Sequence, residues 1–539
     1  MQQATLITAL LGASCGGGGV TPAGLAGSDW SLPDYVQPTG NSGLFSEEAD
    51  PGHHVDTHSV DLSWRQIEPA PGMISTTTTG SANGFTFASL DDQLAIPGQY
   101  WMRIFASGVD WAPDWVIADC GVAAVGTDAD GEPHLPIWNA CLWGHLRDLY
   151  TALYATRGMA ADPDLRFVYV PGGFDFVEFD LDIVQQAFDA GLVTEPEFTG
   201  WFHGAIGDLV TIFGEHADKL VYTGEDYPFG PFGAGDDLLA RDAVVAGMGI
   251  RNGITELANF HLNEVPAFGA TIGPDGHLVT DESWLLLDGR HVIAAENECY
   301  DACGFHSADP EYSVTRSNLK ALQLRVNWLY VVGADSFLDE FVDHWHWVRL
   351  SIGKTVSDSA DAWCALREAE DKYWEDDPSI TWTGHPFVRN LERWLVQKEV
   401  APDGLTRRGS DRRVNDLDPA NGTAFEGRVT HRAAGADSMY FDLDDRFLGP
   451  GSAVRRVAVN VTYLDAGDTG WSLEYAGAGG ARQTDEVTNS GGGTVRTATF
   501  VIDDGAWNGT LAGGTDLRIR VSNGDLEVRF VRVIKLDPP

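Results

Sequence analysis

The chain of 539 residues has few positively charged side chains, and this excludes some classes of binding partner. Lys and Arg together number 35 against 79 Asp and Glu, which gives a net charge of −44. A surface of that sign repels nucleic acid and anionic membranes, so we expect neither as a partner. Beyond the N-terminus, no segment reaches the ~18 consecutive apolar residues that a membrane-spanning helix needs.

Several catalytic motifs are also absent. Without Gly-x-Ser-x-Gly a serine hydrolase is not expected, and without His-Glu-x-x-His a zinc peptidase is not expected. The first predicted strand lacks a following Gly-x-Gly-x-x-Gly, which argues against dinucleotide binding. Two groups have metal-ligand character, namely Cys299-x3-Cys303 with His306, and His344-Trp345-His346. Neither has enough further ligands nearby, so we expect no metal and no cofactor.

The N-terminus predicts export. Residues 1–14 are short and mostly small or apolar, and Cys15 follows, ahead of a glycine run. This segment looks like a bacterial lipoprotein signal, although it lacks Lys and Arg and has Gly12 where Leu is usual. We therefore expect either an extracellular protein or an outer-membrane or cell-surface lipoprotein that is attached through a lipidated Cys15. Residues 1–50 are predicted to be this signal and a flexible linker.

The chain has only six cysteines, and export would permit them to form disulfides. With Cys15 set aside, the spacing suggests Cys120–Cys141 and Cys299–Cys303 as pairs. Cys364 is then predicted to be unpaired and buried.

Residues 51–405 alternate apolar runs with amphipathic stretches, which predicts an α/β domain. The predicted strands are Ser59–Trp64, Tyr100–Phe105, Arg166–Val170, Lys219–Thr223, Gly253–Leu257, His291–Glu296 and Ala334–Leu338. The predicted helices are Leu142–Thr156, Ile183–Ala190, Trp201–Gly214, Asp236–Met248, Ser313–Val332 and Ser357–Ala369. Seven strand–helix units favour a (β/α)8 TIM barrel with one strand undetected near its start. A doubly wound open sheet is the alternative.

Residues 415–539 have a different pattern. Short alternating runs are separated by Gly, Asn and Asp, and helical periodicity is missing, so an all-β sandwich is predicted. Its predicted strands are Val454–Tyr463, Trp471–Tyr475, Val495–Ile502, Leu517–Val521 and Leu526–Ile534. We interpret this sandwich as an accessory domain behind the barrel.

Two segments of the predicted barrel end in carboxylates. Residues 165–179 and 290–298 each begin as an apolar strand and run into acidic side chains. Two carboxyl groups at one rim are the minimum that glycosidic bond cleavage requires. We favour Glu178 over Asp175 in the first segment. In the second we favour Glu296 over Glu298, because Glu296 directly ends the apolar run.

Two further segments resemble a known family. Trp64-x3-Glu68-Pro69-x2-Gly72 follows one predicted strand, and Trp101–Phe105 is followed by Pro113-x-Trp115. These are similar to the early strands of clan A glycoside hydrolases, especially the beta-galactosidase-like branch. The resemblance implies that Trp64 borders a sugar pocket and that Arg103 orients a catalytic carboxylate. An Arg103 that only stabilises the rim is the alternative.

The resemblance also implies roles for the carboxylates. In that clan the acid/base ends the fourth strand and the nucleophile ends the seventh, which assigns Glu178 and Glu296 respectively. Their carboxyl groups should then lie ~5–5.5 Å apart, whereas ~6.5–9.5 Å would indicate inversion. The alternative for Glu296 is a structural ion pair with Arg290 or Arg251.

Other polar and aromatic residues near predicted strand ends are candidates for binding sugar hydroxyls and ring faces. They are Asp175, Asp226, Tyr227, Glu256, Asn259, Glu298 and Trp345. The sequence thus predicts an exported glycoside hydrolase that acts on a poly- or oligosaccharide with retention. The alternative is a non-catalytic, glycan-binding surface lipoprotein with a degenerate barrel.

Overall fold

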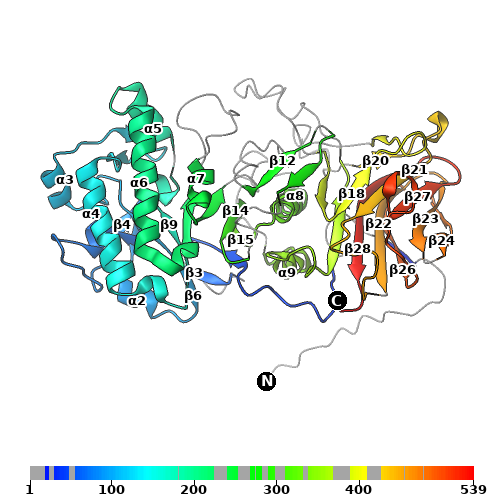
Figure 1. Ribbon diagram of the computed structural model, residues 1–539, viewed down its shortest axis with the longest axis horizontal. Coiled ribbons are helices and arrows are strands. Elements are labelled where there is room, and N and C mark those ends of the chain that lie inside the picture. The colour runs from blue at the N-terminus through cyan, green and yellow to red at the C-terminus, as the bar shows by residue number, and fades with distance from the viewer. Residues whose placement is uncertain are drawn as a thin grey trace.

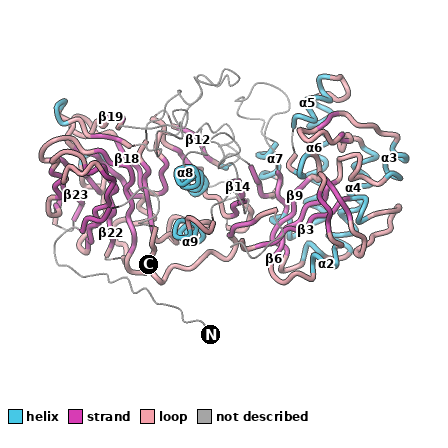
Figure 2. Tube along the Cα trace, turned by 180° about the vertical axis from the view of Figure 1, so that it is seen from behind, coloured by secondary structure: helices cyan, strands magenta, loops and turns pink. Residues whose placement is uncertain are grey.

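The computed structural model describes most of the chain. It covers residues 19–22, 30–47, 55–179, 181–223, 239–252, 268–273, 275–281, 289–297, 310–331, 338–367, 389–409, 427–454, 456–477 and 479–538. A parallel barrel and an antiparallel sandwich lie side by side along the long axis, with helices α8 (Pro310–Gln323) and α9 (Val342–Ser351) between them (Figure 1). Figure 2 shows the same arrangement from behind. None of the described helices has the length and apolar character needed to cross a membrane.

Eight parallel strands close into a barrel in chain order. They are β2 (Gly43–Phe45), β3 (Thr57–Ser63), β6 (Gln99–Phe105), β9 (Leu165–Val170), β10 (Leu220–Thr223), β11 (Gly249–Asn252), β14 (Ile293–Asn297) and β15 (Trp328–Val331). The undetected strand is thus β2, inside the predicted linker. This order confirms β9 as fourth and β14 as seventh, and it excludes the doubly wound alternative.

Glycine allows β2 to close the barrel. A Cβ on Gly43 would lie 2.8 Å from both the Asp56 Cβ and the Trp328 ring, so a larger residue would force the strand or these neighbours to move. Leu44 and Phe45, which complete the strand, are fully buried.

Helices follow most barrel strands in the described ranges. They are α1 (Trp64–Ile67) and α2 (Leu90–Leu94) after β3, α3 (Asp114–Cys120) and α4 (Ala140–Tyr150) after β6, α5 (Leu181–Asp189) and α6 (Glu195–Phe213) after β9, and α7 (Leu239–Val245) after β10. α8 follows β14, and α9 follows β15. Between β2 and β3 no described residue is helical. After β11 the described residues form the hairpin β12 (Ala270–Ile272) and β13 (Leu278–Thr280).

Two predicted helices are wrong in whole or in part. The predicted helix over 313–332 ends at Gln323, and the aromatic run from Trp328 forms barrel strand β15 instead. The predicted helix over 357–369 contains strand β16 (Asp361–Ala365), which pairs with β28 (Glu527–Lys535). In both places long-range sheet pairing overrides the local helical tendency. The predicted strands over 253–257 and 334–338 lie wholly or mostly outside the described residues, and β11 and β15 precede them.

The second domain is a sandwich of two antiparallel sheets. One contains β1 (Gly19–Pro22), β26 (Thr494–Ile502), β22 (Val457–Asp465), β28, β16 and β17 (Leu391–Arg393), joined by β19 (Arg407–Arg408) and β20 (Arg428–Val429). The other contains β18 (Leu395–Lys398), β21 (Ser438–Leu443), β27 (Leu517–Val521), β23 (Gly470–Gly477), β24 (Gly480–Gln483) and β25 (Val487–Thr488). All five predicted strands are confirmed within two or three residues. Strands β16 to β18 join this sandwich although they precede the predicted boundary at residue 405.

One predicted disulfide is confirmed. Cys120 at the end of α3 is bonded to Cys141 at the start of α4, with a Cα–Cα distance of 5.6 Å. Cys364 is free and buried, also as predicted. Cys15, Cys299 and Cys303 lie outside the described residues.

Candidate active site

A layer of polar side chains caps the barrel interior. Phe45, Trp101, Phe167, Ala294 and Trp328 belong to the apolar cluster inside the barrel. Because strand side chains alternate, the residues two positions further along face the same interior, nearer the C-terminal mouth. These positions hold Glu47, Arg103, Tyr169, Glu296 and Tyr330. The apolar core of the barrel is therefore covered at its C-terminal end by this layer of charged and tyrosine side chains.

Glu178 and Glu296 converge on one cation. Arg251 Nη2 lies 2.5 Å from Glu178 Oε1 and also contacts Glu296 Oε1. Two carboxylates that contact the same Arg251 nitrogen lie far closer to each other than the ~10 Å that would exclude a catalytic pair. The Glu296 and Arg251 side chains are 4% and 5% exposed, whereas Glu178 is 32% exposed. Glu296 is therefore the deep carboxylate, and Glu178 lies at the rim.

The ion pair between Glu296 and Arg251 is the one that the sequence offered as an alternative to catalysis. It does not decide between the two roles, because a nucleophilic carboxylate must also be kept ionised. The same guanidinium nevertheless stands between Glu178 and Glu296. The catalytic roles of both residues stay predictions.

The loop that carries Glu178 has an unusual backbone. Three non-glycine residues just before it, Phe174, Phe176 and Val177, have φ angles of 62°, 48° and 64°. Such conformations are costly for bulky or β-branched side chains and persist only where surrounding contacts impose them. Two barrel side chains supply such contacts. Thr223 Oγ1 donates to Val177 O at 2.6 Å, and Arg103 Nη1 donates to Phe176 O at 3.1 Å.

A buried Ser–His–Asp chain supports the same loop. His134 lies 2.8 Å from Ser107 Oγ through Nδ1 and 2.8 Å from Asp128 Oδ2 through Nε2. Ser107 Oγ in turn accepts a hydrogen bond from the Phe174 N–H at 3.2 Å. Ser107 is fully buried, so its hydroxyl is not accessible as a nucleophile. The three side chains therefore help to hold the loop in place.

Arg103 does not contact either of the two carboxylates predicted to be catalytic, and it lies beside two others. Its Nε donates to Asp61 Oδ1 at 2.6 Å, and its Nη1 contacts Glu47 Oε1. Asp61 and Arg103 are register partners on β3 and β6, which brings the two charges together. Although burial opposes it, these two carboxylates raise the pKa of Arg103. Arg251, and not Arg103, is the cation beside Glu296.

Two carboxyl groups near this centre have pKa values close to neutral pH. Burial raises the pKa of Glu47 to about 7, and repulsion from Glu178 adds to the effect of burial against the attraction of Arg103. Burial also raises the pKa of Asp175 to about 7, helped by Asp128 and Asp130 and opposed by a hydrogen bond from Asn83. Titration near neutral pH is typical of functional sites.

Glu47 should make stability depend on pH. Its pKa of about 7 exceeds the ordinary 4.5, so between these values the folded protein keeps a proton that the unfolded chain releases. Its contribution to stability is therefore full below pH 4.5 and is lost as the pH rises through 7. We expect Glu47→Gln to gain stability relative to the native protein over this window, in urea unfolding at several pH values. Parallel plots of unfolding free energy against pH for the two proteins would contradict this. Because Asp175 keeps its raised pKa in the variant, the stability of Glu47→Gln should still fall with pH, but less steeply than that of the native protein.

Two predicted pocket residues lie elsewhere. Trp64 is fully buried in the core outside the barrel, and its Nε1 donates to Glu68 Oε2 at 2.9 Å. Trp345 on α9 is buried in the same core. Both pack helices against strands, so neither lines the centre formed by Glu178 and Glu296. Asp226, Tyr227, Glu256, Asn259 and Glu298 lie outside the described residues.

Three residues of the centre were missed as site residues. Arg251 enters the sequence-based prediction only as an alternative ion-pair partner, because the sixth strand was placed after it. Glu47 was assigned to the linker. Asp61 offered the clearest signal, since a carboxylate and Arg103 occupy matching positions in two consecutive strands.

Metal-ligand geometry occurs once among the described residues, at Asp119, Cys120, Cys141 and His145. Both sulfur atoms there are already joined in the disulfide. His344 is buried against Trp30 and Trp347, and burial lowers its pKa to about 3. His346, two residues away on α9, is exposed, so these two histidines do not converge.

No family model matches the chain, and no curated protein matches it. Two solved carbohydrate-binding modules each align with 26% of the chain. They are the C-terminal CBM6 of LamC, a marine laminarinase from Zobellia galactanivorans (10% identity, 99% of that chain, TM-score 0.16), and CBM6cm-2 from Cellvibrio mixtus lichenase 5A in complex with cellotriose (14% identity, 95% of that chain, TM-score 0.15). The enzymatically active domain of bacteriophage CBA120 tailspike protein 4 aligns with 26% of this chain and 18% of its own (14% identity, TM-score 0.13). Such low scores carry no argument about function.

Proposed function

We propose that the protein is a retaining glycoside hydrolase whose barrel is a (β/α)8 barrel of clan A. The observation that carries the proposal is the convergence of Glu178 and Glu296 at the C-terminal mouth of a closed parallel barrel. Catalytic residues of such barrels lie at this end. Glu178 follows the fourth strand and Glu296 lies at the C-terminal end of the seventh, the two strands that the resemblance implied.

The different surroundings of the two carboxylates fit different roles. Glu296 is buried beside Arg251, which favours the ionised form that a nucleophile needs. Its oxygen attacks the anomeric carbon while the bond to the leaving oxygen breaks, and Glu178 gives that oxygen a proton. Glu178 then takes a proton from water, which attacks the anomeric carbon and releases Glu296.

Arg251 adds a condition to this mechanism. It contacts Glu178, whereas in the first step Glu178 must face the leaving oxygen of the sugar to give it a proton. The entering sugar must therefore separate the more exposed Glu178 from Arg251 and leave Glu296 paired. The strained loop before Glu178 is the segment that would adjust.

The position of Arg251 favours a second candidate function. A guanidinium between the carboxylates fits a barrel that binds glycan without cleaving it, because the reacting carbon would need that space. Export belongs to both candidates. A disulfide between Cys120 and Cys141 supports it, because such bonds persist in oxidising compartments.

A panel of polysaccharides and oligosaccharides separates the two candidates. We expect the purified protein to release reducing ends from at least one glycan, and NMR of the first product to show a retained anomeric configuration. The double variant Glu178→Gln/Glu296→Gln is the control for contaminating activity. Binding to a glycan without release of reducing ends, at the background level of the control, would favour the binding protein.

A further inference from the structure

A cavity of about 390 Å3 lies where the barrel meets the sandwich. Hairpin strand β13 and the C-terminal end of α8 line it from the barrel side, and β17, β18 and β21 line it from the sandwich side. Its polar lining includes Gln323, the arginines Arg325, Arg393 and Arg446, and the carboxylates Glu392, Asp442 and Asp444. It is separate from the centre formed by Glu178 and Glu296.

Two buried residues of this cavity have donor groups without acceptors. Arg393 and Gln323 are only 2% and 5% exposed. Within the described chain, neither Nε nor Nη1 of Arg393 has a hydrogen-bond partner, and the same holds for Nε2 of Gln323. The remaining Nη2 of Arg393 donates to Lys354 O at 3.1 Å. Buried donors without acceptors are costly, so this arrangement calls for an acceptor.

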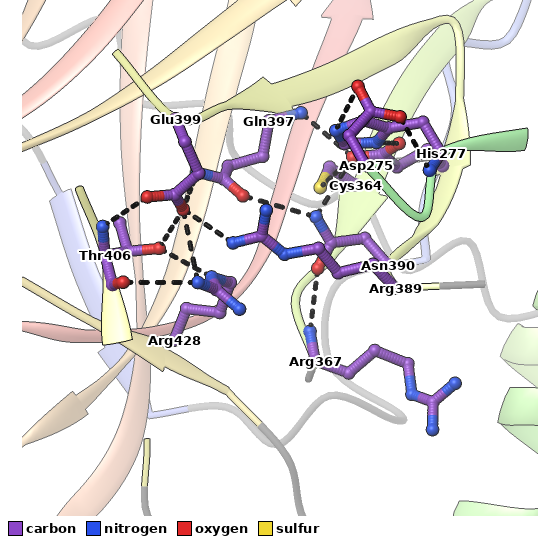
Figure 3. A network of polar contacts seen from close by, with 11 residues as sticks. Asp275, His277, Cys364, Arg367, Arg389, Asn390, Gln397, Glu399, Thr406 and Arg428 are labelled. Atoms are coloured by element: carbon purple, nitrogen blue, oxygen red, sulfur yellow. Dashed lines mark hydrogen bonds and ion pairs between the residues drawn. The ribbon is translucent and has the colours of Figure 1, made fainter. Parts of the chain in front are cut away.

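The nearby carboxylates are engaged elsewhere. Glu392, next to Arg393, accepts hydrogen bonds from His277 Nδ1 at 2.7 Å and from the Gln397 N–H at 2.9 Å. Figure 3 shows His277, Cys364, Asn390 and Gln397 within this network. Asp442 is paired with Lys398 at 2.6 Å and Asp444 with Arg446 at 2.6 Å. None of these acidic residues forms an ion pair with Arg393 in the described part of the chain.

The charge of Arg393 is accordingly poorly compensated. Burial lowers its pKa to about 9, and repulsion from Arg325 acts in the same direction. The attraction of Asp361 opposes both, but Asp361 is already paired with Arg532 at 2.7 Å. The Arg393 guanidinium also lies over the Trp394 ring, 4.2 Å from its centroid, which fixes the plane of the charge.

We propose that this cavity binds a small oxyanion, a carboxylate or sulfate group, held by Arg393 and Gln323. A planar guanidinium presents several N–H donors to such an anion, and the Gln323 amide adds a neutral donor. The overall charge of −44 repels anions from the surface in general, so binding here requires these local donors. The oxyanion is either a free ion or a group carried by an acidic sugar.

The test measures thermal unfolding and calorimetric binding on the full chain. Sodium sulfate and sodium glucuronate are the probes, with sodium chloride at equal ionic strength and neutral glucose as controls. We expect a saturable rise in Tm with at least one oxyanion and none with glucose. A gradual, unsaturated rise with sulfate is its general salt effect and would count against the site. Response to glucuronate alone indicates a sugar-borne carboxylate, and response to sulfate alone indicates a sulfate group.

Variants place the binding in this cavity. Arg393→Gln removes a charged hydrogen-bond donor, so its Kd for the oxyanion should be roughly tenfold to hundredfold higher than that of the native protein. Gln323→Met keeps the side-chain length and should weaken binding by about threefold or more, and it decides the question if Arg393→Gln does not fold. Arg482→Gln is the matched control, because that exposed arginine is paired with Asp504 outside the cavity and should leave Kd nearly unchanged.

Two results would overturn the proposal. One is a native protein that responds to both oxyanions no more than to chloride. The other is an unchanged Kd in the folded variants at Arg393 and Gln323. Neither result depends on glycoside hydrolysis, so the two proposals fail separately.

Discussion

Glu296→Gln is expected to abolish turnover of every glycoside. Without the carboxylate no covalent glycosyl-enzyme forms, and an amide is too weak a nucleophile to replace it. The substitution keeps the shape of a side chain that is almost fully buried, so the fold should survive. Initial rates on an aryl glycoside and on a natural glycan measure the loss.

Glu178→Gln should behave differently on the same two substrates. An aryl glycoside with a good leaving group needs little protonation, so the first step should persist and the covalent intermediate should accumulate as a burst. Azide should then restore turnover, because it attacks without a general base. On a natural glycan we expect a loss of roughly 10²–10⁴-fold, the usual contribution of general acid/base catalysis.

Asp175→Asn is the matched control for this pair of variants. Asp175 lies on the same loop and is the alternative acid/base, and its pKa of about 7 would suit the role. If azide restores Asp175→Asn and not Glu178→Gln, the role passes to Asp175. Equal activity of the native protein and the Glu178 and Glu296 variants would favour the glycan-binding alternative.

The order of the barrel could be predicted because buried parallel strands leave a strong local signal. The runs at 100–105, 166–170 and 219–223 are mostly apolar, so each was found within one residue. β2 could not be found in this way. It has three residues, lies in a Gly- and Ser-rich stretch, and becomes a strand only because β3 and β15 flank it.

The carboxylates of the site could be predicted and their cation could not. Glu296 is the last residue but one of its strand β14, so its place at the mouth is a local property of the sequence. Arg251 reaches the same centre through strand β11, whose position was predicted several residues too late. Glu178 reaches it through Phe174, Phe176 and Val177, whose positive φ angles have no signal in residue type. Such conformations result from the contacts around the loop and are not preferences of its residues.

Removal of Arg251 should have the largest effect on stability. Arg251→Met leaves Glu178 and Glu296 facing each other without their shared cation, and Glu296 is 4% exposed. Breaking a buried ion pair on one side typically costs about 3–5 kcal/mol. We expect a loss of this size in urea unfolding at pH 7. Arg147→Met is the control, because Arg147 pairs with Asp148 and Asp208 at the surface and should change stability by less than about 0.5 kcal/mol.

Two further measurements identify the uncompensated carboxylates as the cause. In Arg251→Met the folded protein should bind protons more readily than the unfolded chain. Its loss of unfolding free energy relative to the native protein should therefore grow as the pH rises from 5 to 8. Glu296→Gln added to Arg251→Met removes one of the two charges and should recover part of the lost stability, which a double-mutant cycle measures. A deficit independent of pH, or no recovery in the double variant, would show that Arg251 acts through packing beside Tyr169 and Tyr330 and not through its charge.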